Sequence, residues 1–242
     1  MPSNPPVRPP ARTKRTRASC FQESRLKWRR KSSEFLEKRD GVGPPDPTEA
    51  LLAAARAGRP GALGELLERH SNYLRLLARL HLRRFPGCKE DAADVLQETL
   101  IAAHHGFDQF RGENEASWLA WLRRILANRL SNIARKYLAT RQRDARREVN
   151  LQKDLDASSA GLSSILEDGG PTPSAVVMGR EIAVRLADAM AKLPDDYREV
   201  LVLRNLEEKS FPEIAAQMGR SLDSVKNLWA RAVAKMRQAV GE

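Results

Sequence analysis

The sequence predicts an all-α protein, and three observations lead to that prediction. Along most of the chain after residue 47, apolar residues recur at intervals of three, four and seven, which is the spacing of amphipathic helices. No long segment alternates apolar and polar residues in the way that a half-buried strand does. Aromatic residues make up only 5% of the 242 residues, which disfavours a β-sandwich or a β-barrel.

The positive charge is concentrated at the N-terminus. The formal net charge is +11, and residues 1–45 hold 12 Lys and Arg against 4 Asp and Glu. Pairs of prolines interrupt this segment, so we expect residues 1–47 to form a disordered basic leader. Such a leader attracts polyanions by counterion release, but a solvated tail without a binding role would have the same composition.

Composition also excludes several classes of protein. No apolar run is long enough to span a membrane, and the N-terminus lacks the apolar segment of a secretory signal. The two cysteines, Cys20 and Cys88, cannot build a disulfide framework or a four-cysteine metal site. We therefore expect a cytoplasmic protein with no membrane partner.

Helix start and stop residues divide the body into two helical domains. Four helices are expected in the first domain, at residues 48–58, about 60–85, 91–105 and 116–137. In the third of these helices we expect Val95, Ile101 and Ala102 to face the core. A flexible linker is expected at residues 141–177, because much of it is rich in Ser, Gly and Asp and it contains two prolines. The predicted domains are thus residues 48–140 and 178–242.

The second domain contains the spacing of a helix-turn-helix. After a helix predicted at about 194–207, a short helix from Phe211 is followed by Gly219, which suits the turn. Ser221 can cap the next helix. The outer side of that helix carries polar residues that can reach a DNA groove, namely Ser224, Lys226, Asn227 and Arg231. A basic amphipathic helix in an ordinary bundle would show the same charges.

Acidic residues on the third helix allow three interpretations. Asp91, Asp94 and Glu98 are three and four residues apart, so they share one face. This face can be a solvated surface, a docking face for a basic partner, or part of a metal site for nuclease chemistry. A metal site needs further converging carboxylates, and none is evident. Because the motifs GxxxxGK[ST], HExxH, CxxC and GxSxG are also absent, we expect no catalytic residues, no metal and no cofactor.

Cations on the fourth helix are typical of single-stranded nucleic-acid binding, in which basic side chains track the backbone and flat side chains stack on bases. Trp118 and Trp121 could stack on bases, although tryptophans at this spacing are more often core residues. The polar loop Phe110–Glu115 is a better candidate for base capture. The polar candidates on the helix include Arg123, Arg124, Asn128, Arg135 and Lys136.

These segments together resemble bacterial RNA polymerase sigma factors of the extracytoplasmic-function (ECF) type. The resemblance rests on four stretches in family order: GRPGALGELLERH at 58–70, DVLQE at 94–98, WLAWLRRILANRL at 118–130, and the stretch from LPDDYREV to AVAKMR at 193–237. The chain departs from the family pattern in two places. Asn132 stands where the family often has Asp, and Leu228 and Trp229 replace a commoner Arg-Leu pair.

What the resemblance implies is a protein without catalytic residues that works on core RNA polymerase and promoter DNA. Region two, at 48–140, would dock on the clamp coiled coil of the β′ subunit through Asp94, Gln97 and Glu98. Region four, at 178–242, would bind the β flap with its apolar side. An anti-sigma factor is a further implied partner. The implied minus-35 contacts are Ser221, Ser224, Lys226, Asn227 and Arg231. The implied minus-ten contacts are Arg111, Asn114, Arg123, Arg124, Asn128, Arg135 and Lys136.

Two other functions stay open at this point. A transcriptional activator could use the helix-turn-helix without docking on core polymerase, although this leaves the acidic face of the first domain without a role. A metal-dependent nuclease could use Asp91, Asp94 and Glu98.

Overall fold

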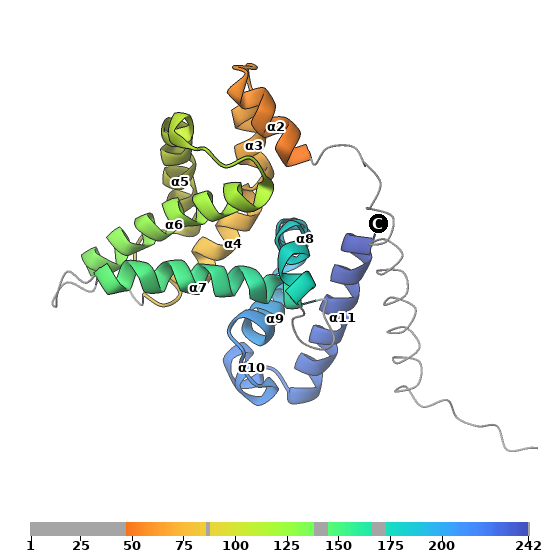
Figure 1. The fold of residues 1–242 in the computed structure, drawn as a ribbon. Helices are drawn as coiled ribbons and strands as arrows, with labels where there is room; N and C mark the ends of the chain where they lie inside the picture. Colours follow the sequence, from red (N-terminus) through yellow and green to blue (C-terminus); the bar gives the residue numbers. More distant parts are fainter. Residues whose placement is uncertain (1–46, 86–87, 138–144, 166–172, 242) are drawn as a thin grey trace, which may run out of the picture. The chain divides into compact units, whose positions relative to one another are not determined.

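The computed structural model describes residues 47–85, 88–137, 145–165 and 173–241, and the first helix of that part is labelled α2 (Figure 1). Within these ranges every regular element is helical, as the apolar spacing predicts. Residues 47–242 form one compact unit, and the predicted basic leader lies outside the described residues. In the described part of the chain, no helix is both long and apolar enough to cross a membrane.

The described helices cover both predicted domains. The first domain contains α2 (Pro47–Arg56), α3 (Ala62–Arg69), α4 (Ser71–Leu82), α5 (Ala92–Gly106), the 3-10 helix η1 (Phe107–Gln109) and α6 (Glu115–Tyr137). The rest contains α7 (Ala145–Ser164), α8 (Pro173–Ala191), α9 (Asp195–Leu201), the π-helical turn η2 (Val202–Leu206), α10 (Phe211–Met218) and α11 (Leu222–Gly241). The predicted helices at 91–105 and 116–137 are confirmed within a residue or two.

The single helix predicted at about 60–85 is instead two helices, α3 and α4, that meet at His70. His70 adopts φ −104° and ψ 2°, which is outside helical geometry, and its side chain is fully buried. Its Nδ1 lies 2.8 Å from the carbonyl oxygen of Leu66. A buried polar side chain that bonds to the preceding turn thus accompanies the break, and apolar spacing alone does not reveal it.

The inward face of α5 differs from the prediction. Val95 is buried as expected, but Ile101 is 48% exposed and Ala102 is exposed as well. The helix turns by roughly 100° per residue, so Ile101 lies about 240° around the helix from Val95. Thr99 and Ala103, at four-residue spacing from Val95, complete the buried side instead.

The predicted flexible linker is largely helical. Helix α7 begins at Ala145 and buries Leu151, Leu155 and Leu162, and it packs against α6 and α8. Helix α8 begins at Pro173, because proline is tolerated at the first position of a helix. Leucines at four- and seven-residue spacing therefore outweigh the Ser and Gly content of this segment. The remaining linker residues, 141–144 and 166–172, lie outside the described residues.

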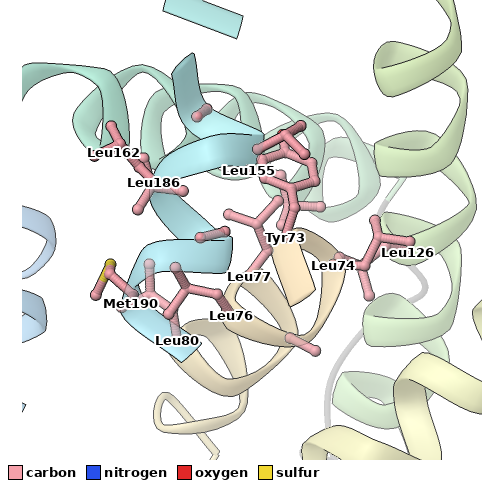
Figure 2. Close-up of a cluster of buried hydrophobic side chains, with 14 of the residues drawn as sticks. Tyr73, Leu74, Leu76, Leu77, Leu80, Leu126, Leu155, Leu162, Leu186 and Met190 are labelled. Atoms are coloured by element: carbon pink, nitrogen blue, oxygen red, sulfur yellow. The ribbon is translucent and has the colours of Figure 1, made fainter. Parts of the chain in front are cut away.

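Helix α4 lies at the centre of the core. It packs against α5, α6, α7 and α8, and so contacts both predicted domains. Burial of one leucine side chain contributes roughly 1.5–3 kcal/mol, so this shared cluster contributes much of the folding free energy. The cluster in Figure 2 contains Tyr73, Leu74, Leu76, Leu77 and Leu80 of α4 with Leu126, Leu155, Leu162, Leu186 and Met190.

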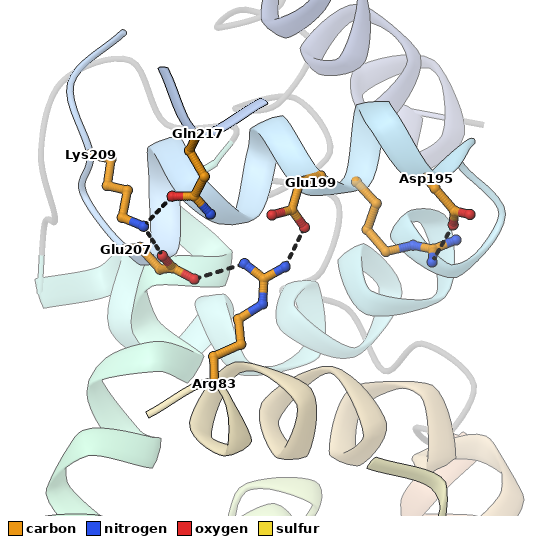
Figure 3. A network of polar contacts seen from close by, with 7 residues as sticks. Arg83, Asp195, Glu199, Glu207, Lys209 and Gln217 are labelled. Atoms are coloured by element: carbon orange, nitrogen blue, oxygen red, sulfur yellow. Dashed lines mark hydrogen bonds and ion pairs between the residues drawn. The ribbon is translucent and has the colours of Figure 1, made fainter. Parts of the chain in front are cut away.

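A network of ion pairs joins the end of α4 to the second domain (Figure 3). Arg83 Nη1 lies 3.0 Å from Glu207 Oε1, and Arg83 Nη2 pairs with Glu199 of α9. Lys209 Nζ lies 2.9 Å from Glu207 Oε2 and donates to Gln217 Oε1 of α10 at 2.6 Å. Burial alone would raise the pKa of Glu207, but hydrogen bonds from Lys209 and Arg83 hold that pKa below its ordinary value. Polar contacts thus accompany the apolar contact between the domains.

Acidification will destabilise the packing of α7 on α4 through His81. This side chain is fully buried with Nε2 3.3 Å from Ser158 Oγ, and burial together with the charge of Arg84 lowers its pKa from 6.5 to about 4. Between these two values the unfolded chain binds a proton that the folded chain does not. The free energy of unfolding should therefore fall as the pH falls from 6.5 to 4, by up to about 3 kcal/mol for this group.

Urea unfolding at a series of pH values measures this loss. His81→Gln should flatten the pH dependence in that range. His104→Gln, which changes an exposed histidine at the end of α5, should leave the dependence as it is. An unchanged pH dependence in His81→Gln would show that another group carries it.

Candidate nucleic-acid interface

Helices α10 and α11 form the predicted helix-turn-helix. Ser210 and Glu213 close a reciprocal capping box at the start of α10, with Ser210 N donating to Glu213 Oε2 at 2.8 Å. Gly219 ends α10 with φ +62°, a left-handed conformation that glycine adopts without strain. Ser221 Oγ then accepts from Ser224 N at 3.3 Å, so Ser221 caps α11 as predicted.

The outer face of α11 brings the candidate minus-35 residues together. Ser221, Lys226, Asn227 and Arg231 are exposed, while Ser224 is half-buried. A shallow hollow on this face is lined by Arg220, Ser224, Asn227, Leu228 and Arg231. Sequence reasoning did not include Arg220, although its place in the turn just before the capping serine was a usable signal. This cation pairs with Asp196 of α9.

Trp229 faces the interior of the helix-turn-helix and not the hollow. Its Nε1 donates to Asn205 Oδ1 at 3.2 Å, and its ring meets the ring of Phe211 edge to face, with centroids 5.7 Å apart. The guanidinium of Arg204 covers Phe211, 4.9 Å from the ring centroid. The tryptophan that departs from the family pattern therefore holds α11 against η2 and α10.

The loop before α6 packs aromatic side chains on its inner side and exposes polar side chains on its outer side. Phe110 is buried, with its centroid 5.3 Å from that of Trp118 and 5.1 Å from that of Trp121. Trp118 is fully buried and Trp121 is half-buried, so the core interpretation of Trp118 is the one that the structure favours. Arg111 and Asn114, the two candidate contacts in the loop, are both exposed.

The candidate DNA contacts on α6 comprise exposed residues and one buried residue. Arg124, Asn128 and Arg135 are exposed and are four and seven residues apart, so they lie along one side of the helix. Lys136 is also exposed, with its Nζ 2.9 Å from Glu90 Oε1. Asn132 accepts a hydrogen bond from Arg135.

The prediction that Arg123 contacts DNA needs correction. Its side chain is only 4% exposed, its Nε donates to Asp156 Oδ1 at 2.6 Å, and its Nη1 donates to the Tyr73 hydroxyl at 3.0 Å. Burial opposes the charge, but Tyr73 and Asp156 raise the pKa of Arg123 above its ordinary value. Arg123 faces α7, and no α7 was expected in that segment. Its role in this structure is to tie α6 to α4 and α7.

The candidate docking residues lie on the outer face of α5. Asp94, Gln97 and Glu98 are all exposed, and Glu98 also pairs with Arg129 of α6. Asp91 instead caps the helix, accepting from Ala93 N at 2.8 Å and from Asp94 N at 2.9 Å. Within the residues that the structure describes, no three His, Cys, Asp or Glu side chains are placed to hold a metal ion. Nothing in this geometry supports the nuclease interpretation of the acidic residues.

A helix-turn-helix together with a second helical face of exposed cations is typical of DNA-binding transcription proteins. Residues 70–143 match the family model described as Sigma-70 region 2, and residues 183–236 match the model described as Sigma-70, region 4. The chain belongs to the RNA polymerase sigma factors of the sigma-70 family, and it is of the ECF type. It directs promoter-specific transcription, and the match to region 2 disfavours an activator that uses the helix-turn-helix alone.

Relatives match the chain over most of its length. The RNA polymerase sigma factor CnrH of Cupriavidus metallidurans is 32% identical over 195 residues, which cover 81% of this chain and 95% of CnrH. The ECF sigma factor SigM of Mycobacterium tuberculosis is 29% identical over 191 residues, covering 79% of this chain and 83% of SigM. The solved structure of CnrH in complex with the cytosolic domain of CnrY is 28% identical, covers 81% of this chain and 98% of that chain, and gives a TM-score of 0.32.

Two neighbouring arginines of α6 should respond differently to removal. Arg123→Ala deletes a buried cation and leaves the Tyr73 hydroxyl without that donor, so it should lower the free energy of unfolding by about 2 kcal/mol. Arg124→Ala removes an exposed side chain and should leave stability within about 0.5 kcal/mol of the parent. Chemical denaturation of the two variants measures both values. Equal effects on stability would contradict the burial of Arg123.

Proposed function

We propose that this sigma factor docks on core RNA polymerase through the exposed face of α5 formed by Asp94, Gln97 and Glu98. The partner surface is the clamp coiled coil of the β′ subunit, and region four binds the β flap with its apolar side. What supports the first contact is that all three side chains are solvent-exposed, while the residues that pack α5 lie on its other side. A solvated surface would show the same exposure, and the match of residues 70–143 to sigma-factor region 2 is what favours docking.

Helix α11 reads the minus-35 element in this proposal. A major groove admits one helix, and α11 offers it an outer face free of large apolar side chains apart from Leu222 and the half-buried Leu228. Amide and guanidinium groups of Asn227 and Arg231 can bond to base edges, while hydroxyls contact phosphates. The residues assigned to this role are Ser221, Ser224, Lys226, Asn227 and Arg231.

The loop before α6 and the outer stripe of α6 hold the melted minus-ten strand. Opening the duplex exposes unstacked bases at a cost of a few kcal/mol per base, and a cationic surface beside a shaped loop offsets that cost. Arg123 is buried and takes no part in this contact. The candidate residues that remain are Arg111, Asn114, Arg124, Asn128, Arg135 and Lys136.

The observation that carries this proposal is that one chain presents two polar surfaces on different helices, each within a segment that matches a sigma-factor region. The proposal assigns no catalytic residue, metal or cofactor to the chain, because the polymerase supplies the chemistry. Its place of action is the cytoplasm, where the polymerase works. An anti-sigma factor is a further proposed partner, since the related CnrH forms a complex with the cytosolic domain of CnrY.

Reconstitution with core polymerase tests the proposal directly. Holoenzyme formed with the full chain should yield a promoter-dependent run-off transcript, and the chain alone should bind the same promoter poorly. A folded protein that gives no promoter-dependent transcript would overturn the proposal. Tight promoter binding without polymerase would instead support the activator.

Arg231→Ala should weaken minus-35 recognition by about 1–3 kcal/mol and relax the preference for one base pair. Lys235→Ala is the matched variant, because Lys235 lies one turn further along α11, with its Nζ 5.4 Å from the centroid of the Tyr197 ring, and we expect it to meet phosphate and not base edges. It should weaken all sequences alike and lower the salt dependence of binding. Holoenzyme binding to promoter variants at several salt concentrations measures both. If Arg231→Ala weakened all variants equally, Arg231 would not be a base-reading residue.

A further inference from the structure

Helix α2 contacts the loop proposed to capture the minus-ten strand, although it precedes the segment that matches region 2. That match begins at residue 70, and α2 ends at Arg56. At the start of α2, Thr48 Oγ1 donates to Glu115 Oε1 at 3.1 Å. At its end, the Arg56 guanidinium donates to the carbonyl oxygen of Gly112. The two ends of α2 thus hold two points of the loop.

The contact with Glu115 is buried. Glu115 begins α6 and its side chain is 8% exposed, with Oε1 3.5 Å from His70 Nε2. Burial alone would raise the pKa of this carboxyl. The neighbouring His70, the hydrogen bond from Thr48 and the charge of Arg69 lower the pKa instead. The carboxylate therefore stays ionised and keeps accepting from α2.

The contact with Gly112 lies where the loop is tightly packed. A Cβ at Gly112 would lie 2.3 Å from Ser117 Oγ and 2.5 Å from Phe110 Cζ, so no side chain fits there without movement. Arg56 also lies over the Phe110 ring, with its Cζ 5.7 Å from the centroid. The guanidinium of Arg56 therefore contacts both the carbonyl oxygen of Gly112 and the ring of Phe110 on the inner side of the loop.

The other end of the loop is held by α6 itself. Asn114 Oδ1 accepts from Ser117 N at 2.9 Å, and Ser117 Oγ donates to the Asn114 carbonyl oxygen at 2.8 Å. Arg111, just before the first anchor, and Asn114, at the second, are both exposed. The loop is thus ordered from inside, before any strand binds.

We propose that α2 is a positioning element for minus-ten strand capture, with Arg56 and Thr48 holding the loop in its binding shape. The inference rests on the proposed role of the loop in capturing that strand. A loop that is already ordered loses less conformational entropy when the strand binds. Pre-ordering therefore strengthens binding without adding a contact. Arg56 and Thr48 act through Gly112 and Glu115 and need not touch the DNA.

The test separates strand capture from the other binding steps. A promoter selected by the reconstituted holoenzyme from a random library supplies the probes. These are its single-stranded minus-ten oligonucleotide, its minus-35 duplex, and the full promoter with 2-aminopurine in the minus-ten strand. For Arg56→Ala we expect about tenfold weaker binding of the single strand and a slower fluorescence rise on opening. Binding to core polymerase and to the minus-35 duplex should be unchanged.

Matched variants distinguish positioning from general stability. Arg59→Ala removes a nearby exposed arginine that pairs with Glu65 at 3.0 Å within the same segment, and it should leave strand capture unchanged. Arg56→Lys keeps a cationic donor and should restore most of the affinity. Thr48→Val keeps the shape of the side chain but removes the donor to Glu115, and it should weaken capture as Arg56→Ala does.

Three outcomes would overturn the proposal, and they are distinguishable. If Arg111→Ala weakens single-strand binding but Arg56→Ala does not, the loop captures the strand without help from α2. If neither Arg111→Ala nor Asn114→Ala weakens it, the proposed role of the loop itself fails. If Arg56→Ala weakens core binding and minus-35 binding as much as single-strand binding, its effect is on overall folding and not on positioning.

Discussion

Burial of the apolar side of α4 positions the two helices that carry most candidate contacts of region two. Helix α4 packs against α5 and α6, whose outer faces hold the candidate docking residues and most candidate strand-binding residues, and against α7 and α8, which lead to region four. Leu74 and Leu77 are fully buried at this junction. Because close-packed interiors transmit small displacements, a shift of α4 would move the polymerase face and the strand face together.

Each helix that carries candidate contacts packs one side into the core and exposes the other side to solvent. On α6 the division falls between neighbours, since Arg123 is a buried structural cation and Arg124 is exposed. A rotation of roughly 100° separates adjacent residues on a helix, which is enough to move a side chain from solvent to core. On α11 the same division separates Trp229, which packs inward, from Arg231, which faces solvent. The packing of one side of each helix thus determines which side chains its other side presents to solvent.

Local patterns predicted much of this structure, because they depend on few residues. The helix-turn-helix follows from apolar spacing, a turn glycine and the capping Ser221, all within about twenty residues. Helix α7 was missed because the composition of its segment suggested a linker, whereas its leucines find partners on α6 and α8. The burial of Arg123 follows from that same helix, since Asp156 lies on α7. The clamp of α2 on the loop joins residues 67 and 56 positions apart, beyond the reach of any periodicity.

Contacts on the inner side of the loop before α6 hold its shape, while its proposed DNA-reading side chains point outward. Its shape depends mainly on Gly112, Phe110 and the anchors from α2 and α6. Arg111 and Asn114 add one side-chain contact each, since Arg111 Nη1 donates to the Asp108 carbonyl oxygen at 2.8 Å and Asn114 Oδ1 accepts from Ser117 N at 2.9 Å. Most of the scaffold is thus independent of the proposed reading groups. With the proposed role of the loop, retargeting this protein to another promoter would mean exchanging outward side chains on a largely unchanged frame, whereas even a methyl group at Gly112 would distort the frame itself.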